Sequence, residues 1–308
     1  MATVRMLTRN DVEAVVHRIA RHLIDDAEHC AWVNPALDDE ILRRALRDSR
    51  AATWIALEGD RVTGHLYGAI LEGGSYARGV WVGPDGASWD DADTLADLYA
   101  VAGQEWIDQD ALDHYVWVLD NEESTRPWYE LGFARMHMRG VLALEQRPVR
   151  ALPARYTRRT GTLDDLNLAV RLTQEIDRSQ ARGPSFALDH HAGSLRHELA
   201  ETLSDPEVAY HLVEYDGIGI GQCITFPLEP RRGSFDATLH LSAVAVLDEH
   251  QGRGVASALL DAVTCEALDD GYNFVETNWR VTNQRAQRYW THYGFHPTYV
   301  RLHRRIGS

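Results

Sequence analysis

The stretch Leu241–Val263, LSAVAVLDEHQGRGVASALLDAV, decides the fold. Its first part is rich in β-branched and small apolar residues, which predicts a strand that ends at Val246. After four intervening residues, QGRGVA at 251–256 opens an apolar helical pattern. A helix N-terminus presents unpaired backbone N–H groups and the positive end of the helix dipole. This strand–loop–helix order therefore predicts an anion-binding loop.

The composition of the loop is compatible with the binding of a pyrophosphate. Gly252 and Gly254 allow the backbone to approach a ligand closely, and Arg253 adds positive charge beside it. The alternative is a strand–loop–helix in which the glycines serve only to form the turn. Two other nucleotide sites are excluded, because the chain has no Gly-x-x-x-x-Gly-Lys-Ser/Thr loop and no Gly-x-Gly-x-x-Gly opening a βαβ unit.

A second motif follows about one strand and one helix later. Gln-x-x-Gly-x-Ala after a strand, followed by Asn-x-x-Ala and then Gly-Phe, resembles the GNAT superfamily of acyl-CoA-dependent N-acyltransferases. The residues that carry this resemblance are Gln251, Gly254, Ala256, Asn283, Ala286, Gly294 and Phe295. The resemblance implies a mixed sheet with flanking helices and acetyl-CoA as co-substrate.

The second motif also occurs in the first half of the chain. Asn121, Trp128, Gly132 and Phe133 precede Asn283, Trp290, Gly294 and Phe295 by 162 positions each, and the same offset relates Trp117 to Trp279 and Val82 to Val244. Six matches at one offset predict a tandem duplication. The two-domain arrangement resembles the architecture of the mycothiol synthases.

We therefore predict an α/β fold of the α+β, mixed-sheet kind, with two tandem GNAT domains, each a mixed, mostly antiparallel sheet with flanking helices. The first domain covers 1–143, the proline-containing segment 144–154 is a linker, and 155–308 is the catalytic domain. In the first domain we expect helices over about 11–23, 38–48, 93–108 and 122–131, and strands over 4–7, 53–58, 63–71, 79–82, 114–119 and 133–143. In the second we expect strands over 155–160, 208–215, 218–226, 237–246, 273–279 and 297–306, and helices from 162 and over 188–203, 252–269 and 283–293.

The first domain lacks the anion-binding loop. At the offset of 162, positions 251–256 correspond to 89–94, which read WDDADT. Three Asp residues there repel a pyrophosphate. We expect the first domain to be degenerate and to cover the catalytic domain or shape its acceptor cleft.

The resemblance assigns cofactor contacts residue by residue. The end of the fourth strand would hold the pantetheine arm, the loop N–H groups would hold the pyrophosphate, and an Asn would fix the far end of pantetheine. The residues implied are Val244, Ala245, Val246, Gln251, Gly252, Arg253, Gly254, Val255, Ala256, Ser257 and Asn283.

Catalysis of acyl transfer to an amine needs a base and a donor to the carbonyl. His240 occupies the strand position where family members often carry a Glu, and it is the candidate base; a strand histidine without a chemical task is the alternative. The backbone N–H near Val246 is the candidate carbonyl donor. The usual acid position holds Trp290, so Tyr293, three residues on, is the remaining candidate, with packing as its alternative.

Other chemistry-bearing groups form weaker patterns. Asp189, His190 and His191, with Glu198 and Glu214, are positioned to hold a cationic acceptor, or else form a solvated helix start. We expect no metal site, because no histidine pair shows ligand spacing. Cys223 and Cys265 are expected to be buried free thiols.

Composition limits the partners. The 308-residue chain has a formal net charge of −15, which disfavours general binding to nucleic acid or to an anionic membrane. No apolar run approaches the roughly 18 residues of a membrane span, no signal peptide is readable, and three distant cysteines form no disulfide framework. We expect a cytoplasmic monomer or homodimer.

The resemblance to the GNAT superfamily therefore implies transfer of an acetyl group from acetyl-CoA to a primary amine of a small molecule or peptide, by direct transfer. Two alternatives stay open. One is aminoacyl transfer from a charged tRNA, which the net charge disfavours unless Arg231–Arg232 or Arg301–Arg305 forms a local basic patch. The other is a non-catalytic acyl-CoA-binding protein, an alternative that the Trp290 substitution leaves open.

Overall fold

The computed structural model describes residues 2–36, 38–47, 52–73, 76–146, 148–187, 194–229 and 231–307. The chain divides into two compact units. Unit 1 comprises residues 1–138, 231–234 and 297–308, and unit 2 comprises residues 139–230 and 235–296. Asp189, His190 and His191, and with them the predicted start of a helix at 188, lie outside the described residues.

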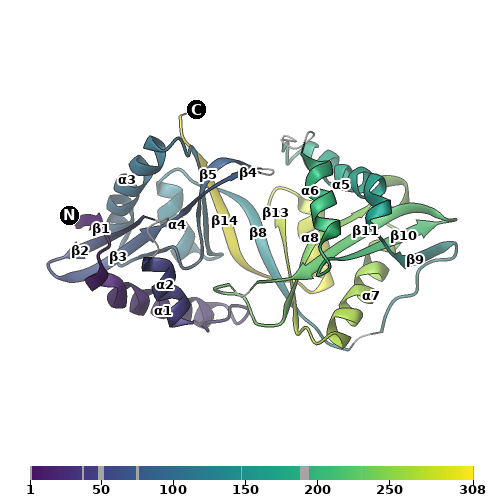
Figure 1. Cartoon of the computed structure of the whole chain (residues 1–308), viewed down its shortest axis with the longest axis horizontal. Helices are drawn as coiled ribbons and strands as arrows, with labels where there is room; N and C mark the ends of the chain where they lie inside the picture. Colours follow the sequence, from purple (N-terminus) through teal and green to yellow (C-terminus); the bar gives the residue numbers. More distant parts are fainter. Residues whose placement is uncertain are drawn as a thin grey trace. The chain divides into compact units, whose positions relative to one another are not determined.

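Unit 1 begins with a four-stranded antiparallel sheet in the order β1-β2-β3-β6. Its strands are β1 (Thr3–Met6), β2 (Thr53–Glu58), β3 (Arg61–Tyr67) and β6 (Ala87–Trp89). The short helix η1 (Arg9–Asp11), α1 (Val12–His29) and α2 (Asp39–Arg47) lie on one face, and α3 (Ala92–Asp108) lies on the other (Figure 1). Successive side chains of a strand point to opposite faces of the sheet, so neighbouring residues of β2 pack against helices on different faces. Ile55 packs in the α1–α2 cluster, whereas Trp54 meets Trp106 of α3 edge-on at 6.0 Å.

A second group of strands completes unit 1. β4 (Ala69–Gly73) pairs antiparallel with β5 (Tyr76–Val82), and β5 pairs parallel with β7 (Asp113–Leu119). α4 (Glu122–Glu130) follows β7 and leads into β8 (Ala134–Ala143). The last strand of the chain, β14 (His296–Arg305), pairs antiparallel with β7, from Tyr299 opposite Leu119 to Arg305 opposite Asp113.

Unit 2 repeats this plan. β9 (Tyr156–Thr160), β10 (Ala209–Tyr215), β11 (Ile218–Pro227) and β12 (Thr238–Val246) are antiparallel neighbours, and β13 (Phe274–Arg280) is parallel to β12. η2 (Leu163–Asp165), α5 (Leu166–Ala181) and α6 (Leu195–Ser204) lie on one face; η3 (Asp248–His250) and α7 (Val255–Asp269) follow β12, with α7 on the other face (Figure 1). α8 (Gln284–Tyr293) packs beside α7, because Tyr293 Oη donates to Asp261 at 2.8 Å. The mixed, mostly antiparallel sheet with flanking helices is confirmed.

Two corresponding strands are exchanged between the units. β14 belongs to unit 1 from Pro297 onward and stands next to β7, while residues 139–143 of β8 belong to unit 2, and β8 stands next to β13. The compact units therefore differ from two continuous halves of the chain. The boundaries 1–143, 144–154 and 155–308 stay a prediction about the duplicated sequence. Residues 144–146 and 148–155 form no helix or strand, and the backbone N–H of Arg150 donates to Asp261 of α7 at 3.1 Å.

The offset of 162 relates elements as well as residues. β8 maps onto β14 residue for residue, and α3, α4, β5 and β7 map onto α7, α8, β12 and β13 within two residues at their starts. Trp128 meets Phe133 at 5.0 Å and 77°, and Trp290 meets Phe295 at 5.1 Å and 77°. Both tryptophans therefore occupy the same packing position on the last helix of each repeat.

The structure corrects several element boundaries. The first helix continues past residue 23 to His29, because buried Asp26 accepts a hydrogen bond from Tyr299 Oη at 3.0 Å. The strand expected over 63–71 breaks at Gly68, where a Cβ would lie 2.6 Å from Val80. β6 was not predicted, and the helix expected from 252 begins at Val255. The capping box of Thr162 and Asp165 is present.

Among the described residues, no helix combines the length and apolarity needed to cross a membrane.

Candidate functional site

The loop between β12 and α7 has open space around both of its glycines. Gly252 and Gly254 have φ angles of +72° and +79°, and a Cβ added at either would meet no heavy atom within 4 Å. Gly254 is the N-cap of α7, and none of the described side chains caps the helix there. The first N–H groups of a helix have no partner within the helix. This end of α7 therefore offers backbone donors to an anion.

Gln251 fixes the start of the loop. Its Nε2 donates to the carbonyl of Val246 and to Asp248 Oδ1, both at 2.9 Å. Asp248 in turn forms an ion pair with Arg182 Nη1 at 3.0 Å. The glutamine side chain thus ties the loop to the last residue of β12. The sequence motif predicted Gln251 as a ligand contact, and its positioning contacts are additional to that prediction.

β12 and β13 pair only near their starts. The parallel register covers Thr238–His240 opposite Phe274–Glu276, and β12 continues to Val246 beyond it. At the point of separation, Thr277 Oγ1 donates to the carbonyl of Leu241 at 2.9 Å. The edge of β12 from Leu241 onward, which includes Val244, Ala245 and Val246, therefore does not pair with β13.

A bulge in β12 was not predicted. Leu241 lies opposite Thr225 and Ala243 opposite Ile224, so Ser242 is an extra residue in the register. Ser242 is exposed within an otherwise buried or half-buried strand. A lone Ser within an apolar run was the sequence signal available for it. Bulges re-aim side chains and often adjoin functional sites.

Unit 1 differs from unit 2 in two places, at the strand pair that corresponds to β12 and β13 and at the start of the helix that corresponds to α7. β5 pairs with β7 over Gly79–Val82, the positions that correspond to 241–244, so these two strands stay together where β12 and β13 separate. At the start of α3, Asp91 Oδ1 accepts from the backbone N–H of Thr94 at 2.7 Å. A carboxylate of the chain itself therefore occupies the donor group that an external anion would use.

Asn283 is the N-cap of α8. Its Oδ1 accepts from the N–H of Ala286 at 3.1 Å, and Asn121 caps α4 by accepting from Ser124 N at 2.7 Å. The shared asparagine thus has a structural task in both repeats. In Asn283 this leaves the Nδ2 group as the donor for a ligand.

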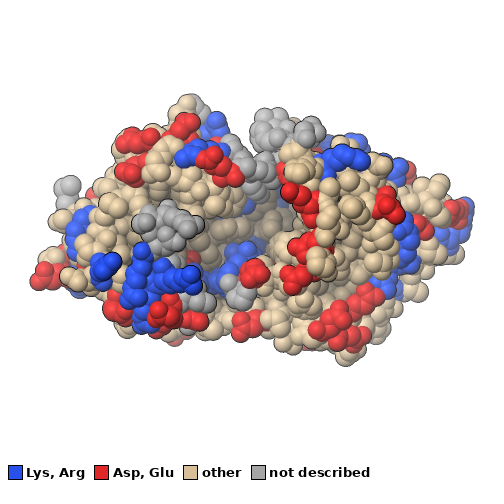
Figure 2. Space-filling model, in the orientation of Figure 1, with Lys and Arg blue, Asp and Glu red and all other residues tan. Residues whose placement is uncertain are grey.

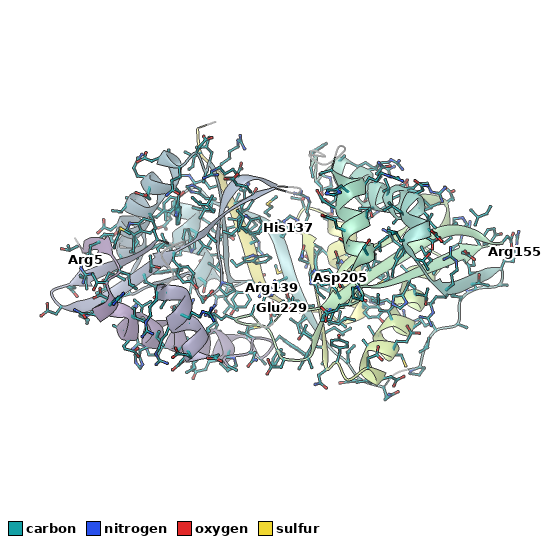
Figure 3. All side chains as sticks on the ribbon, in the orientation of Figure 1. Arg5, His137, Arg139, Arg155, Asp205 and Glu229 are labelled. Atoms are coloured by element: carbon teal, nitrogen blue, oxygen red, sulfur yellow. The ribbon has the colours of Figure 1, made fainter. Side chains whose placement is uncertain are left out.

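His240 lies on β12 at the last position paired with β13. Its register partners are Phe226 and Glu276, and its ring centroid lies 4.9 Å from that of Phe226. Glu276 is buried and forms an ion pair with buried Arg139 of β8 at 3.4 Å; Arg139 is labelled in Figure 3. The candidate base therefore has the acid of a buried charged pair on the neighbouring strand, with its Arg139 partner one strand further away, and the sequence did not indicate this pair.

Tyr293 is buried between α7 and α8. Its hydroxyl donates to Asp261 Oδ1 at 2.8 Å and lies 3.5 Å from Thr264 Oγ1. These contacts favour the packing alternative, and proton donation by Tyr293 stays a prediction. Trp290 is also buried, against Tyr289 and Phe295.

Cys223 is buried on β11, and burial raises the pKa of its thiol to about 12. The thiol is therefore protonated near pH 7 and is a poor nucleophile. In the part of the chain that the structure describes, no group of three or more His, Cys, Asp or Glu side chains is arranged to hold a metal ion.

Arg side chains on the face drawn in Figure 2 lie among acidic ones. Over α1 and α2, Arg43 contacts Glu13 at 2.9 Å, Asp39 at 3.5 Å and Glu40 at 3.9 Å. Such pairs neutralise the basic charge locally.

Sequence comparison places the chain among acetyltransferases. Residues 173–295 match the acetyltransferase (GNAT) family. An uncharacterised N-acetyltransferase of Mycobacterium bovis is 32% identical over 117 residues, which are 36% of this chain and 71% of that protein. An uncharacterised N-acetyltransferase of Mycobacterium tuberculosis matches with the same identity and coverage.

Solved structures share the whole fold. A GCN5-related N-acetyltransferase from Sphaerobacter thermophilus aligns with a TM-score of 0.63 at 19% identity, covering 100% of this chain and 96% of that one. A tandem GNAT protein from the clavulanic acid biosynthesis pathway aligns with a TM-score of 0.56 at 17% identity, covering 100% and 99%. The duplicated architecture and the sequence match agree, and the chain belongs to the GNAT acetyltransferase family as a tandem, two-repeat N-acyltransferase.

Proposed function

We propose that unit 2 transfers an acetyl group from acetyl-CoA to a primary amine of a small molecule or peptide, by direct transfer. The observation that carries this proposal is the loop at the start of α7. Its two glycines have positive φ, the space around them is open, and no side chain in the described part of the chain caps the helix. A Cβ at either glycine would occupy the space from which a pyrophosphate approaches the backbone.

Different segments of unit 2 are proposed to bind different parts of acetyl-CoA. The N–H groups of residues 251–257 face the pyrophosphate, with Arg253 adding charge. The edge of Val244, Ala245 and Val246, which β13 leaves unpaired, hydrogen-bonds the pantetheine arm as a neighbouring strand would. Asn283 Nδ2 donates at the far end. The co-substrate supplies an acyl group activated as a thioester.

His240 is the proposed base. It lies where β12 and β13 begin to separate, and its ring takes a proton from the attacking amine directly or through water. The backbone N–H near Val246 donates to the carbonyl oxygen as charge develops there. The protonated thiol of Cys223 supports direct transfer rather than an acyl-cysteine route.

Unit 1 is proposed not to bind acyl-CoA in this way. Asp91 satisfies a donor at the start of α3, and β5 stays paired with β7. Unit 1 therefore lacks the unpaired strand edge and the helix N–H donor that unit 2 offers to acyl-CoA.

Isothermal titration of acetyl-CoA into the wild type and Gly254→Asp tests the binding site. We expect one site per chain in the wild type and at least about a 100-fold loss of affinity in Gly254→Asp, because the carboxylate fills the loop and repels phosphate. Gly217→Asp is the matched control: its φ is +80°, a Cβ there also meets no heavy atom within 4 Å, and it lies in the β10–β11 turn. Two sites per chain, or equal loss in the control, would refute the assignment.

Turnover is tested by thiol release from acetyl-CoA with a panel of primary amines, including peptides with free N-termini. We expect at least one amine to be acetylated, and we expect His240→Asn to lower kcat at least about 10-fold with the KM for acetyl-CoA unchanged. If kcat rises with pH in the wild type and does not rise in His240→Asn, His240 is the base. Binding of acetyl-CoA without turnover of any amine would instead support the non-catalytic alternative.

A further inference from the structure

Residues 180–187, here called the strap, form a compact loop at the end of α5. The backbone N–H of Ala187 donates to the carbonyl of Gln180 at 3.0 Å, and the N–H of Ser185 donates to the carbonyl of Arg182 at 3.1 Å. These bonds fold the strap back on itself, so it has a defined shape of its own. Side-chain contacts then attach it to the rest of unit 2 on two sides.

On one side the strap is attached to the segment that follows β12. Arg182 Nη1 lies 3.0 Å from Asp248 Oδ2. Asp248 Oδ1 also accepts from Gln251 Nε2, which donates in addition to the carbonyl of Val246, both at 2.9 Å. A continuous chain of polar contacts therefore runs from the strap to the start of the proposed pyrophosphate loop.

On the other side the strap is attached to the end of β13 and to the turn before α8. Arg280 Nε donates to Gln180 Oε1 at 2.8 Å, and Thr282 Oγ1 donates to Ser185 Oγ at 3.0 Å. Arg280 is the last residue of β13, and Thr282 directly precedes Asn283, the N-cap of α8. This side therefore adjoins the asparagine that is proposed to hold pantetheine.

The two sides belong to strands that have separated from each other. The parallel pairing of β12 with β13 ends at His240 opposite Glu276. Asp248 and Arg280 both lie beyond this point along the chain from their respective strand pair. The strap thus connects the diverging ends of β12 and β13. A ligand that lies along the unpaired edge of β12 passes between the two attachments and is enclosed by the strap.

The attachments of the strap are at exposed positions. Residues 181–184 and Phe186 are exposed, and the side chains of Arg182 and Asp248 are 61% and 49% exposed. Exposed ion pairs contribute little to stability. Phe186 has a φ of +45°, a left-handed conformation that is strained for a bulky residue and is typical of ligand clamps and switches. Few buried contacts and local strain both favour opening of the strap without unfolding of unit 2.

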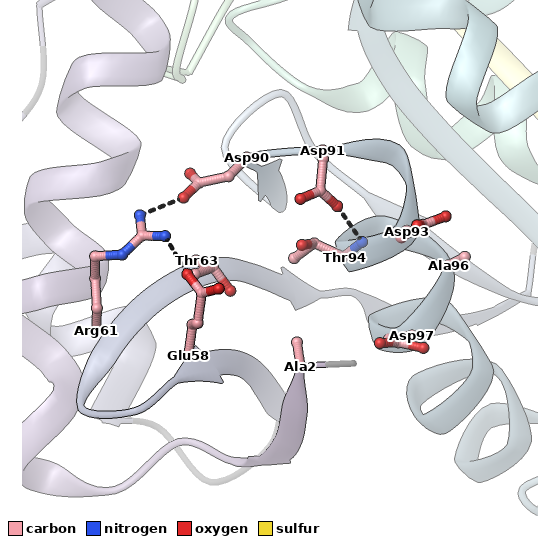
Figure 4. Close-up of a pocket in the computed structure, with 10 residues that line it drawn as sticks. All are labelled: Ala2, Glu58, Arg61, Thr63, Asp90, Asp91, Asp93, Thr94, Ala96 and Asp97. Carbon is pink, nitrogen blue, oxygen red and sulfur yellow. Dashed lines mark hydrogen bonds and ion pairs between the residues drawn. The ribbon is translucent and has the colours of Figure 1, made fainter.

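The corresponding parts of unit 1 are closed by the chain itself. Asp91 accepts from the N–H of Thr94 at the start of α3 (Figure 4). The segment after α1 contains Val33, which is 2% exposed and packs against Leu119 and Tyr299. A buried apolar contact thus fixes this segment in unit 1, whereas exposed polar contacts attach the strap in unit 2. The segment suited to opening is in the repeat that is proposed to bind acyl-CoA.

We propose that the strap is a gate, which closes across the pantetheine arm of bound acyl-CoA and releases Asp248 and Thr282 to let the ligand enter or leave. This inference rests on the acyl-CoA site proposed above. Because the ligand passes only through the open form, its association and dissociation rates both scale with the fraction of time for which the strap is open. Their ratio, the affinity, does not depend on that fraction.

Stopped-flow anisotropy with the fluorescent analogue etheno-CoA measures both rates, and calorimetry with acetyl-CoA measures the affinity. In Arg182→Gln/Thr282→Val we expect both rates to rise at least about 5-fold, with the Kd for acetyl-CoA changed less than about 3-fold. Arg182→Lys keeps the charge opposite Asp248 and should retain rates close to those of the wild type. The matched control is Arg178→Gln, which removes the same charge one turn earlier in α5, where Arg178 pairs with Glu175 of its own helix.

The pattern of rates separates the gate from a merely structural role. A rise in the dissociation rate alone, with weaker binding of acetyl-CoA, would show that the contacts only order the ligand site and would overturn the inference. Unchanged rates in the double variant, or an equal rise in Arg178→Gln, would also overturn it. Absence of etheno-CoA binding by the wild type would instead refute the acyl-CoA site, and the gate with it. Circular dichroism confirms folding, and Arg182→Gln alone decides the matter if the double variant fails to fold.

Discussion

Asp91 Oδ1 accepts a hydrogen bond of 2.7 Å from the backbone N–H of Thr94 in the first turn of α3. At the offset of 162, these residues correspond to Arg253 and Ala256, and among the residues that the structure describes none caps α7 with its side chain. One repeat thus supplies the anion for its helix from its own chain, whereas the other leaves the helix end open. This difference underlies the different tasks proposed for the two repeats.

Asp91→Ala should therefore affect stability and leave acetyl-CoA binding unchanged. Loss of an N-cap typically costs about 1 kcal/mol of unfolding free energy. We expect a decrease of that size in urea unfolding. Asp93→Ala, in the same turn without a cap bond, is the control and should change stability by less than about 0.5 kcal/mol. An equal effect of both changes would show that charge, and not capping, matters here.

Tyr293→Phe separates packing from catalysis. The change removes the donor to buried Asp261, whose other contacts include the N–H of Arg150 at 3.1 Å. Since a buried acceptor loses a partner, we expect the unfolding free energy to fall by about 1–3 kcal/mol. Tyr129→Phe, on an exposed position of α4, should be neutral. Unchanged kcat in Tyr293→Phe would contradict the predicted role as proton donor, and a lost alkaline limb of the pH–rate profile would support it.

The stability of the chain should fall as the pH drops below about 6.5. Burial lowers the pKa of His65 to about 3. Its Nε2 lies 2.9 Å from the carbonyl of Asp85 and its Nδ1 lies 2.7 Å from Ser88 Oγ, so Nε2 carries the proton and Nδ1 accepts. Between pH 6.5 and 3 the unfolded state binds a proton that the folded state excludes, and stability therefore rises with pH in this window.

His65→Asn removes this titration. Between pH 7 and pH 5 the wild type should lose about 2 kcal/mol more unfolding free energy than the variant does, as measured by urea unfolding at both pH values. His17→Asn, on an exposed position of α1, is the control and should keep the wild-type pH dependence. Identical pH dependence of wild type and His65→Asn would refute the assignment.

Deletion of Pro297–Ser308 should destabilise unit 1. β14 pairs with β7 along its length, and Asp113 accepts from His303 Nε2 at 2.8 Å and from Arg305 Nη1 at 2.5 Å. We expect amide hydrogen exchange to rise most in Asp113–Leu119, because these residues lose their ladder partner. Deletion of residues 307–308 alone is the control. Increased exchange confined to unit 2 would contradict the exchanged arrangement.

Much of the fold was predictable because its signals are local. Hydrophobic periodicity located β2 at its observed bounds and placed the last helix and strand of each repeat within one or two residues. Missed features depend on contacts between distant residues. α1 reaches His29 because Tyr299 meets Asp26, and the strand expected over 63–71 breaks because Val80 approaches Gly68. No local pattern reports such contacts.

The same distinction holds for the candidate site. The motif identified the loop glycines, since positive φ and close backbone approach leave few residue choices. It did not indicate that Ser242 forms a bulge, that β12 leaves β13 after His240, or that Arg139 pairs with Glu276. Each of these depends on the register between strands that are distant in sequence.

The sequence by itself indicated the duplication and the family and predicted the residues that face a phosphate, because the motif residues and the offset of 162 are encoded locally and repeated. Only the tertiary structure shows that β14 stands beside β7 and that β8 stands beside β13. β8 and β14 have the same length and correspond residue for residue, so either is able to pair with β7 or β13. Backbone hydrogen bonds do not distinguish equivalent strands, and the choice follows from the packing of side chains such as Tyr299 and Arg305 against unit 1.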